Sequence, residues 1–257
     1  MITSDGRSQL SERVILLTVD AVRVTIIALQ NTVKQVHPNM STAISNIIIF
    51  GATGNTGRQL VELALQRDMN VTAFARDPKK IQVSHARLNI VQGDILDTAS
   101  LNSALSPNID AAISALGVFT RKPSIELSTG TRNIIDALNK NAIRRFVVIS
   151  SLGVDDSRGQ GNFAARVWQR LVIPKMLEDK ERQEKALRDS DLDWTIFRPC
   201  RLIDEPKIRQ DLAEWTGPPP SVRVTWRISM ASLANRILEV LDDPAYSRRA
   251  VNLSDPA

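Results

Sequence analysis

Three evenly spaced glycines are the residues in this chain whose type and position most clearly indicate chemistry. Gly51, Gly54 and Gly57 follow the apolar run 47–50 directly, and an amphipathic run begins near Leu60. Glycine permits a sharp turn and a close approach to a pyrophosphate. The helix that follows points unpaired N–H groups and the positive end of its dipole at the anion. The order of strand, turn and helix therefore predicts a dinucleotide phosphate site, although the spacing is G-x-x-G-x-x-G and not the G-x-G-x-x-G of many dehydrogenases.

Three small polar residues share this turn with the glycines, namely Thr53, Asn55 and Thr56. Their hydroxyl and amide groups can hydrogen-bond a phosphate or cap the following helix. Because a tight turn without any function would also use glycine, the interpretation depends on the elements around the turn.

Cations follow the next predicted strand. The apolar run 71–75 returns after about the length of one helix and ends at Arg76, with Lys79 and Lys80 shortly behind. Sites that prefer NAD place a carboxylate at this strand end for the ribose 2′-hydroxyl, whereas a 2′-phosphate requires a cation. We therefore predict that the cofactor is NADP (NADPH), with Arg76 and Lys80 on its 2′-phosphate. The alternative is that these are solvated loop charges.

Strands and helices alternate from residue 46 to the end of the chain. We predict strands at 47–50, 71–75, 88–91, 111–115, 146–149, 193–197 and 250–253. We predict helices at 60–65, 101–105, 125–138, 163–188 and 229–241, and a loop at 206–220. This alternation predicts an α/β fold, a Rossmann-type doubly wound parallel sheet, in a single domain over 46–257.

The carboxyl ends of parallel strands meet at one edge of such a sheet, and ligands bind there. Asp94 and Ile95 follow the third predicted strand, where the adenine ring would lie. The fourth strand ends in Leu116 and Gly117, and the fifth delivers Ser150 and Ser151 to the same edge.

The composition is that of an ordinary globular protein, with 43% hydrophobic and 24% charged residues. The net charge of +5 would suit a nucleic acid, but the charges are scattered and only 4% of the residues are aromatic. We therefore expect no nucleic-acid partner. The single cysteine, Cys200, excludes an internal disulfide and fits a reducing compartment, so we expect a cytoplasmic protein.

Residues 1–45 do not follow the same pattern, and we expect them to form a poorly ordered N-terminal extension. The run 14–29 is apolar, but Asp20 and Arg23 interrupt it, so it is too short and too charged to span a bilayer. Its spacing allows an amphipathic helix that docks on the domain or on a partner. A start codon assigned upstream of Met40 is an alternative explanation.

Six short motifs together indicate a family. They are GATGNTG at 51–57, ARD at 75–77, GD at 93–94, ALG at 115–117, FVVISSLGV at 146–154 and DWTIFRP at 193–199. The chain from about 46 to 253 resembles the atypical short-chain dehydrogenase/reductases, most closely the NAD(P)H-binding group with flavin reductase (biliverdin reductase B) and the NmrA-like proteins. The resemblance implies NADP across the carboxyl edge, with Leu116 and Gly117 beside the nicotinamide ribose. It also implies a substrate pocket in the loops from about 199 onward.

The resemblance gives a mixed result at the catalytic positions. Better-known members carry Tyr-x-x-x-Lys, in which the tyrosine gives a proton and the lysine lowers its pKa and holds the ribose. The matching segment keeps Lys180, but Met176 stands at the tyrosine position and cannot donate a proton. We assign Lys180 and Ser150 to the cofactor site. The segment 178–182 taken by itself predicts a solvated helix face.

Flavin reductases instead place a serine after the fifth strand and a histidine after the sixth. Ser151 matches the serine, and Arg201 occupies the histidine position. Arginine stays protonated, so Arg201 would be a clamp for an anionic oxygen and not a proton donor. Ser151 and Arg201 are thus the predicted catalytic residues. The alternatives are a serine that satisfies backbone groups and a salt-bridged surface arginine.

Two classes of function follow. The first is an NADPH-dependent reductase that transfers hydride to a small planar acceptor, such as a flavin, a quinone or a conjugated carbonyl. The second is a non-catalytic NADP(H)-binding redox sensor or assembly protein of the NmrA-like type. We expect a small-molecule substrate and no metal. The sequence leaves open whether the protein is a monomer or a dimer.

Overall fold

The computed structural model describes residues 44–117, 122–220 and 223–257. The predicted extension, 1–45, lies outside the described residues except for its last two. Eight strands form one sheet in the order β3-β2-β1-β4-β5-β6-β10-β8. Their bounds are β1 (Asn46–Phe50), β2 (Asn70–Ala75), β3 (Leu88–Gln92), β4 (Ala111–Ser114), β5 (Arg145–Ile149), β6 (Asp193–Pro199), β8 (Ala213–Trp215) and β10 (Arg249–Ser254).

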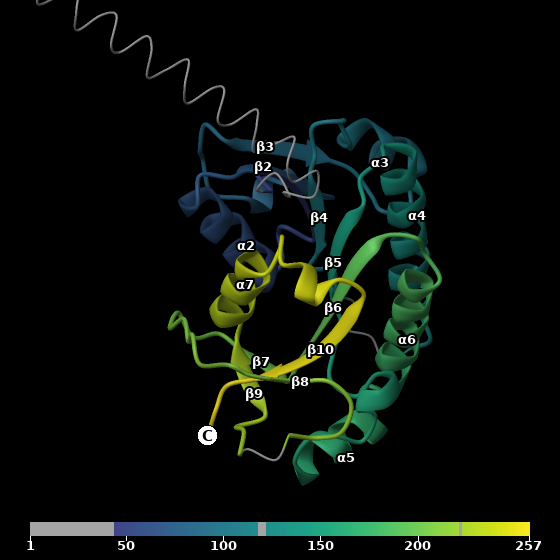
Figure 1. Cartoon of the computed structure of the whole chain (residues 1–257). Coiled ribbons are helices and arrows are strands. Elements are labelled where there is room, and N and C mark those ends of the chain that lie inside the picture. Colours follow the sequence, from purple (N-terminus) through teal and green to yellow (C-terminus); the bar gives the residue numbers. More distant parts are fainter. Residues whose placement is uncertain (1–43, 118–121, 221–222) are drawn as a thin grey trace, which may run out of the picture. The chain divides into compact units, whose positions relative to one another are not determined.

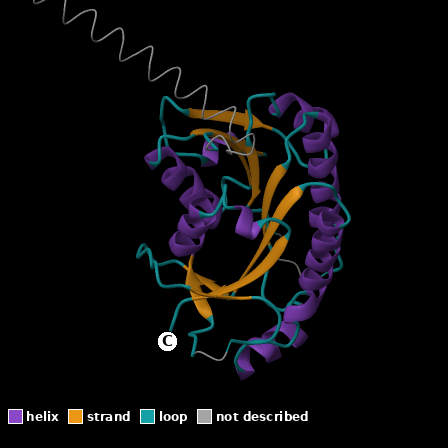
Figure 2. Cartoon of the chain, viewed as in Figure 1, coloured by secondary structure: helices purple, strands orange, loops and turns teal. Residues whose placement is uncertain are grey.

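All neighbours in this sheet run parallel except β8, which is antiparallel to β10 (Figures 1 and 2). The prediction of a Rossmann-type doubly wound sheet is confirmed. β1 shows why the sequence folds this way, because both of its faces are buried. Ile47 and Ile49 belong to one hydrophobic core, and Ile48 and Phe50 belong to the other.

Helices cover both faces of the sheet. On one face α2 (Asn55–Gln66) packs against α7 (Met230–Glu239). On the other face α4 (Glu126–Lys140) lies between α3 (Thr98–Ala104) and α6 (Pro174–Arg188), as Figure 1 shows. Short 3-10 turns occur at Pro78–Lys80, Asp155–Ser157 and Pro244–Tyr246. None of these helices, nor any other in the described part, is long and apolar enough to cross a membrane.

In the second half of the chain one prediction is confirmed with more detail, and one was wrong. The helical region predicted at about 163–188 is confirmed and consists of two helices, α5 (Phe163–Leu171) and α6, because Pro174 lacks the N–H that a continuous helix would need and begins a new one. The loop predicted at 206–220 contains β8. Two further short strands, β7 (Arg201–Ile203) and β9 (Arg227–Ser229), pair with each other outside the main sheet.

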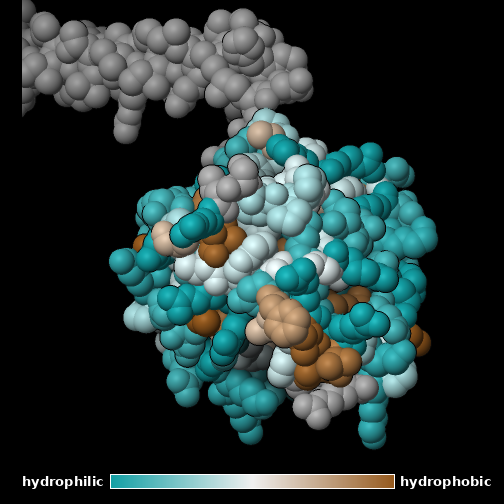
Figure 3. Space-filling model, turned by 90° about the horizontal axis from the view of Figure 1, so that it is seen from below, coloured by the Kyte–Doolittle hydropathy of each residue, from teal (hydrophilic) through white to brown (hydrophobic). Residues whose placement is uncertain are grey.

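Helix α5 turns its apolar side outward. None of its residues is buried, and Phe163 and Leu171 are 77% and 72% exposed. Its inward side is formed by small or polar side chains, since Gln169 donates a hydrogen bond to the carbonyl of Gln160. Figure 3 views this end of the molecule from below and shows a hydrophobic patch where α5 lies.

Candidate functional site: a cleft and a buried ionic network at the carboxyl edge

The glycine turn after β1 requires glycine at two positions. Gly51 has a φ of +78°, and a Cβ on it would lie 2.9 Å from the backbone of Ala115. A Cβ on Gly57 would lie 2.1 Å from the carbonyl oxygen of Gly51, so only glycine lets α2 begin this close to β1.

The amino end of α2 is left open by the residues around it. Its N-cap is Gly54, which offers no capping side chain, and no acidic residue lies in the first turn. Asn55 accepts a hydrogen bond from Arg58, so it does not cap the helix. Thr56 is buried. The first N–H groups of α2 can therefore receive a phosphate.

A cleft of about 230 Å³ opens beside this turn and runs past the carboxyl ends of β2, β3 and β4 to the start of α4. Most of the predicted cofactor residues line it, namely Gly51, Thr53, Gly54, Arg76, Lys80, Asp94, Ile95, Leu116 and Gly117. The sequence analysis missed other lining residues, among them Phe74, Leu96 and Leu127. Phe74 was recognisable only as part of an apolar strand.

The two predicted 2′-phosphate cations are exposed at the end of β2. Arg76 forms no side-chain hydrogen bond or ion pair with another described residue. Lys80 lies 3.9 Å from the carboxylate of Asp77, and its side chain is 68% exposed. Asp77 also accepts a hydrogen bond from the backbone N–H of Lys79, so its carboxylate is held by its own loop.

The far wall of the cleft is fixed by packing and by local hydrogen bonds. Asp94 accepts a hydrogen bond from the N–H of Leu96 at 3.0 Å, which shapes the turn after β3. Ile95 packs on α4 so closely that a Cβ on Gly130 would lie 2.3 Å from its terminal carbon. The loop that would meet the adenine is therefore held against α4.

The other predicted site residues lie outside the lining of this cleft: Asn55, Thr56 and Gly57 in the first turn of α2, Lys180 on α6, and Ser150, Ser151 and Arg201 at the ends of β5 and β6. Ser150 is buried and donates a hydrogen bond to Glu184 at 2.5 Å. Ser151 is half-buried, and its hydroxyl lies 3.2 Å from the carbonyl oxygen of Leu152. Arg201 is exposed on β7, and its side chain forms no hydrogen bond or ion pair with any described residue. The structure thus gives no link between Ser151 and Arg201.

Helix α6 buries two charged residues, Asp179 and Lys180, in the segment where the sequence predicted a solvated face. Asp179 and Lys180 are only 3% and 5% exposed, because α6 packs against α4. Asp179 accepts hydrogen bonds from the backbone N–H groups of Leu127 and Ser128 and from the Ser128 hydroxyl. It therefore caps α4, whose own N-cap, Ile125, has no capping side chain. Because Leu127 lines the cleft, this contact ties α6 to the cleft wall.

Lys180 carries its ammonium group to the carboxyl end of β5. The ammonium donates a hydrogen bond to the carbonyl oxygen of Ile149 at 3.2 Å. Burial lowers the pKa of Lys180 to about 8, and the nearby carboxylates of Glu184 and Asp179 oppose part of that shift.

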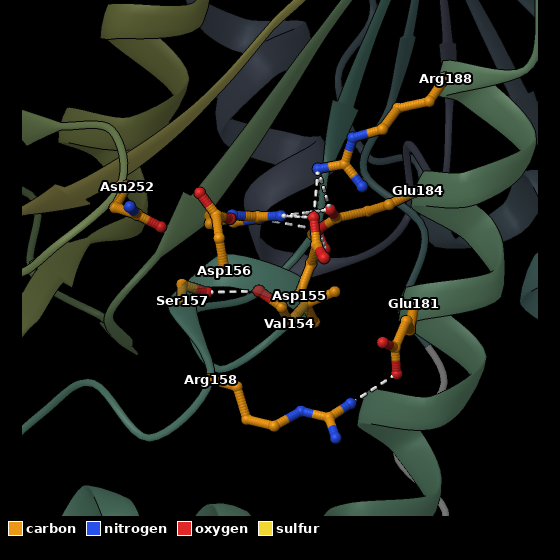
Figure 4. Close-up of polar contacts among 12 residues, drawn as sticks. Val154, Asp155, Asp156, Ser157, Arg158, Glu181, Glu184, Arg188 and Asn252 are labelled. Carbon is orange, nitrogen blue, oxygen red and sulfur yellow. Dashed lines mark hydrogen bonds and ion pairs between the residues drawn. The ribbon is translucent and has the colours of Figure 1, made fainter.

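A buried ionic network continues from Glu184 into β6. Arg198 is fully buried and donates to Glu184 at 2.6 Å and 3.0 Å. It also donates to Asp156, and Arg188 pairs with both Glu184 and Asp155. Figure 4 shows Glu184 and Arg188 reaching from α6 toward the turn that carries the two aspartates. Burial alone would lower the pKa of Arg198, but its hydrogen bonds with Glu184 and Asp156 raise it, so the guanidinium stays charged.

Comparison with known proteins shows to which family the chain is related. The NAD(P)H-binding family model matches residues 51–244. An uncharacterized chloroplastic protein of Arabidopsis thaliana is 31% identical over 172 residues, which are 62% of this chain and 60% of that one. The photosystem II assembly factor Ycf39 of a Synechocystis strain is 29% identical over 159 residues, covering 59% and 43%. The chain therefore spans less than two thirds of the length of these curated relatives.

Solved structures share the fold. The ChuY anaerobilin reductase of Escherichia coli O157:H7 superposes with a TM-score of 0.69 at 24% identity, covering 82% of this chain and 98% of that one. A short-chain dehydrogenase/reductase of Veillonella parvula in complex with NADP gives a TM-score of 0.65 at 21% identity, covering 83% and 95%. With its glycine turn, its cleft and the family match over most of its length, this chain belongs to the NAD(P)H-binding family.

Proposed function

We propose that this protein is an NADPH-dependent reductase that transfers hydride to a small planar acceptor, such as a flavin, a quinone or a conjugated carbonyl. One observation carries the proposal. The open helix end at the glycine turn and the exposed cations Arg76 and Lys80 line the same cleft. A pyrophosphate and a 2′-phosphate are the groups that this combination would bind together.

The proposal assigns a part of the cofactor to each predicted residue, in the cleft and beside it. Gly51, Thr53, Gly54, Asn55, Thr56 and Gly57 would hold the pyrophosphate, and Arg76 and Lys80 the 2′-phosphate. Asp94 and Ile95 would hold the adenine, and Leu116 and Gly117 the nicotinamide ribose, with Ser150 and Lys180 behind it. Bound NADPH supplies the hydride, and the chain's own residues bind and orient it beside the acceptor.

The protons in such a reaction have few protein sources. Tyr246 donates its hydroxyl proton to Glu214 at 2.6 Å and accepts from Arg236 at 2.7 Å, far along the chain from the cleft residues. Burial and the Glu214 carboxylate raise its pKa. Ser151 or solvent would therefore supply any proton. Flavins and quinones need little proton transfer from an enzyme, so they suit this site better than isolated carbonyls.

The test is NADPH oxidation with FMN, and then with a simple quinone, on protein already shown to bind NADPH. We expect turnover with at least one of these acceptors and much slower turnover with NADH. Binding of NADPH without turnover of any planar acceptor would contradict the proposal.

The second candidate is a protein that binds NADP(H) without turnover and acts as a sensor or an assembly partner. It is favoured by Met176 at the position of the family tyrosine, and a relative named as an assembly factor adds support. Intact binding with no turnover would favour it. A cytoplasmic location remains a prediction, and one relative is described as chloroplastic.

A further inference from the structure

Glu184 is the residue on which the buried network converges. Its side chain is fully buried on α6, one helical turn beyond Lys180. It accepts hydrogen bonds from Ser150 at the end of β5 and from Arg198 on β6. It also accepts one from Arg188 on its own helix, as Figure 4 shows. A single carboxylate therefore touches the predicted cofactor site and the buried arginine that holds the turn after β5.

The hydrogen bond to Glu184 decides what Ser150 can do. A serine hydroxyl has one proton to donate, and a carboxylate can only accept. With its Oγ 2.5 Å from Glu184, Ser150 has committed that proton and retains only its capacity to accept. Among the residues that the structure describes, the hydroxyl of Ser151 has one hydrogen-bond partner, the neighbouring carbonyl of Leu152 at 3.2 Å, so it can turn and donate to a bound molecule.

Glu184 also provides negative charge beside Lys180. The ammonium of Lys180 is buried and has one hydrogen bond within the described residues, to Ile149. On α6 it faces Glu184 and Asp179, and it lies next to the network that contains Asp155, Asp156, Arg188 and Arg198. Burial disfavours the charged form, and Glu184 opposes that effect more than Asp179 does.

We propose that Glu184 is a positioning residue with effects on three neighbours. It fixes Ser150 as a hydrogen-bond acceptor for NADPH and leaves Ser151 as the hydroxyl that donates to the acceptor substrate. It also supports the positive charge with which Lys180 holds the cofactor. This assignment rests on the proposed function. The donors that Ser150 would accept from are hydroxyl or amide groups of the nicotinamide half of the cofactor.

The first test separates the two serines. Ser150→Ala should raise the Kd for NADPH about fivefold to tenfold with a smaller change in kcat. Ser151→Ala should lower kcat about tenfold or more and leave the Kd unchanged. Both variants keep the Glu184–Arg198 pair, so both should fold. If Ser150→Ala lowers kcat and spares the Kd, Ser150 is the donor and the proposal is wrong.

The second test follows NADPH binding by fluorescence as a function of pH. In the wild type the affinity should fall as the pH rises through about 8, where Lys180 loses its proton. Glu184→Gln removes a negative charge, so the fall should move to lower pH by on the order of one unit. Glu181→Gln is the matched control. It makes the same change on the same helix, at an exposed residue whose partner is Arg158, and its midpoint should equal that of the wild type.

An unchanged midpoint in Glu184→Gln would overturn the role given to Glu184. If that variant does not fold, the serine pair still decides the assignment. If the wild type binds NADPH but reduces no acceptor, the proposed reductase function fails, and the Kd and pH measurements still test Glu184. If it binds no NADPH, both proposals fail.

Discussion

The two ends of the carboxyl edge are built in different ways. At the end formed by β1, β2 and β3, glycine backbone and exposed cations surround an open cleft. At the end formed by β5 and β6, the buried side chains of Arg198, Glu184 and Ser150 hold one another in place, and Arg198 also reaches the exposed Asp156. The first end is organised by the shape of the backbone, and the second by paired charges in the interior.

This difference suits the two ends to different tasks, one to binding a phosphate and the other to holding reacting groups in place. Charges that recognise a phosphate must meet it from solvent, so in the proposed function Arg76 and Lys80 would contribute affinity without having to stabilise the fold. Charges that orient reacting groups must not move, and burial of Arg198 with Glu184 achieves this. A buried pair of this kind becomes costly when one partner is lost. Substitutions at the two ends should therefore affect different properties.

The largest expected effect is on stability at the buried end. Arg198→Met leaves Glu184 and Asp156 without their main partner, so the free energy of unfolding should fall by about 3–5 kcal/mol. The matched substitution Arg76→Met, at an exposed arginine, should change it by less than about 0.5 kcal/mol. Urea denaturation of the two variants measures both values. Equal losses would mean that the two ends do not differ in this way.

A substitution with an intermediate expected effect on stability tests the glycine turn after β1. Gly57→Ala places a Cβ 2.1 Å from the carbonyl oxygen of Gly51, so the turn must shift, at a cost of about 1–3 kcal/mol. NADPH affinity should fall as well. Gly54→Ala, in the same turn, meets its nearest atom at 3.3 Å and should destabilise the fold less. Denaturation curves that rank the two variants in the opposite order would contradict this account of the turn.

The smallest effect on the fold, and the sharpest on recognition, is expected for Arg76→Ala. Loss of a guanidinium that pairs with a phosphate should weaken NADPH binding by about tenfold to a hundredfold. The Kd for NADH should change by less than about threefold, because NADH has no 2′-phosphate. Fluorescence titration with both cofactors provides the comparison. Equal weakening of both would remove Arg76 from the 2′-phosphate site.

The sequence predicted the cleft better than the network, for a physical reason. Gly51 and Gly57 are required by contacts within one short turn, and Arg76 follows its strand directly, so neighbouring residues were enough to predict the lining of the cleft. The pair Glu184–Arg198 joins two separate elements, and its network reaches back 42 residues to Asp156. No local pattern indicates that pairing.

The burial of α6 and the existence of strand β8 were both missed, for similar reasons. Helix α6 buries charged and polar residues, including Asp179, Lys180 and Gln183, so its buried face carries no apolar periodicity. Strand β8 has only three residues and is held by pairing with the distant β10. One signal was available: Arg198 stands at the end of the apolar strand 193–199, and a charge in such a strand requires a buried partner.

The central claim is that this cleft presents NADPH for hydride transfer to a planar acceptor. The most direct test is a single turnover under anaerobic conditions, with NADPH deuterated at C4 and with FMN or a quinone as acceptor. We predict one acceptor reduced per NADPH consumed, with slower transfer from the deuterated face. If NADPH binds but no reduced acceptor forms, the reductase account is contradicted.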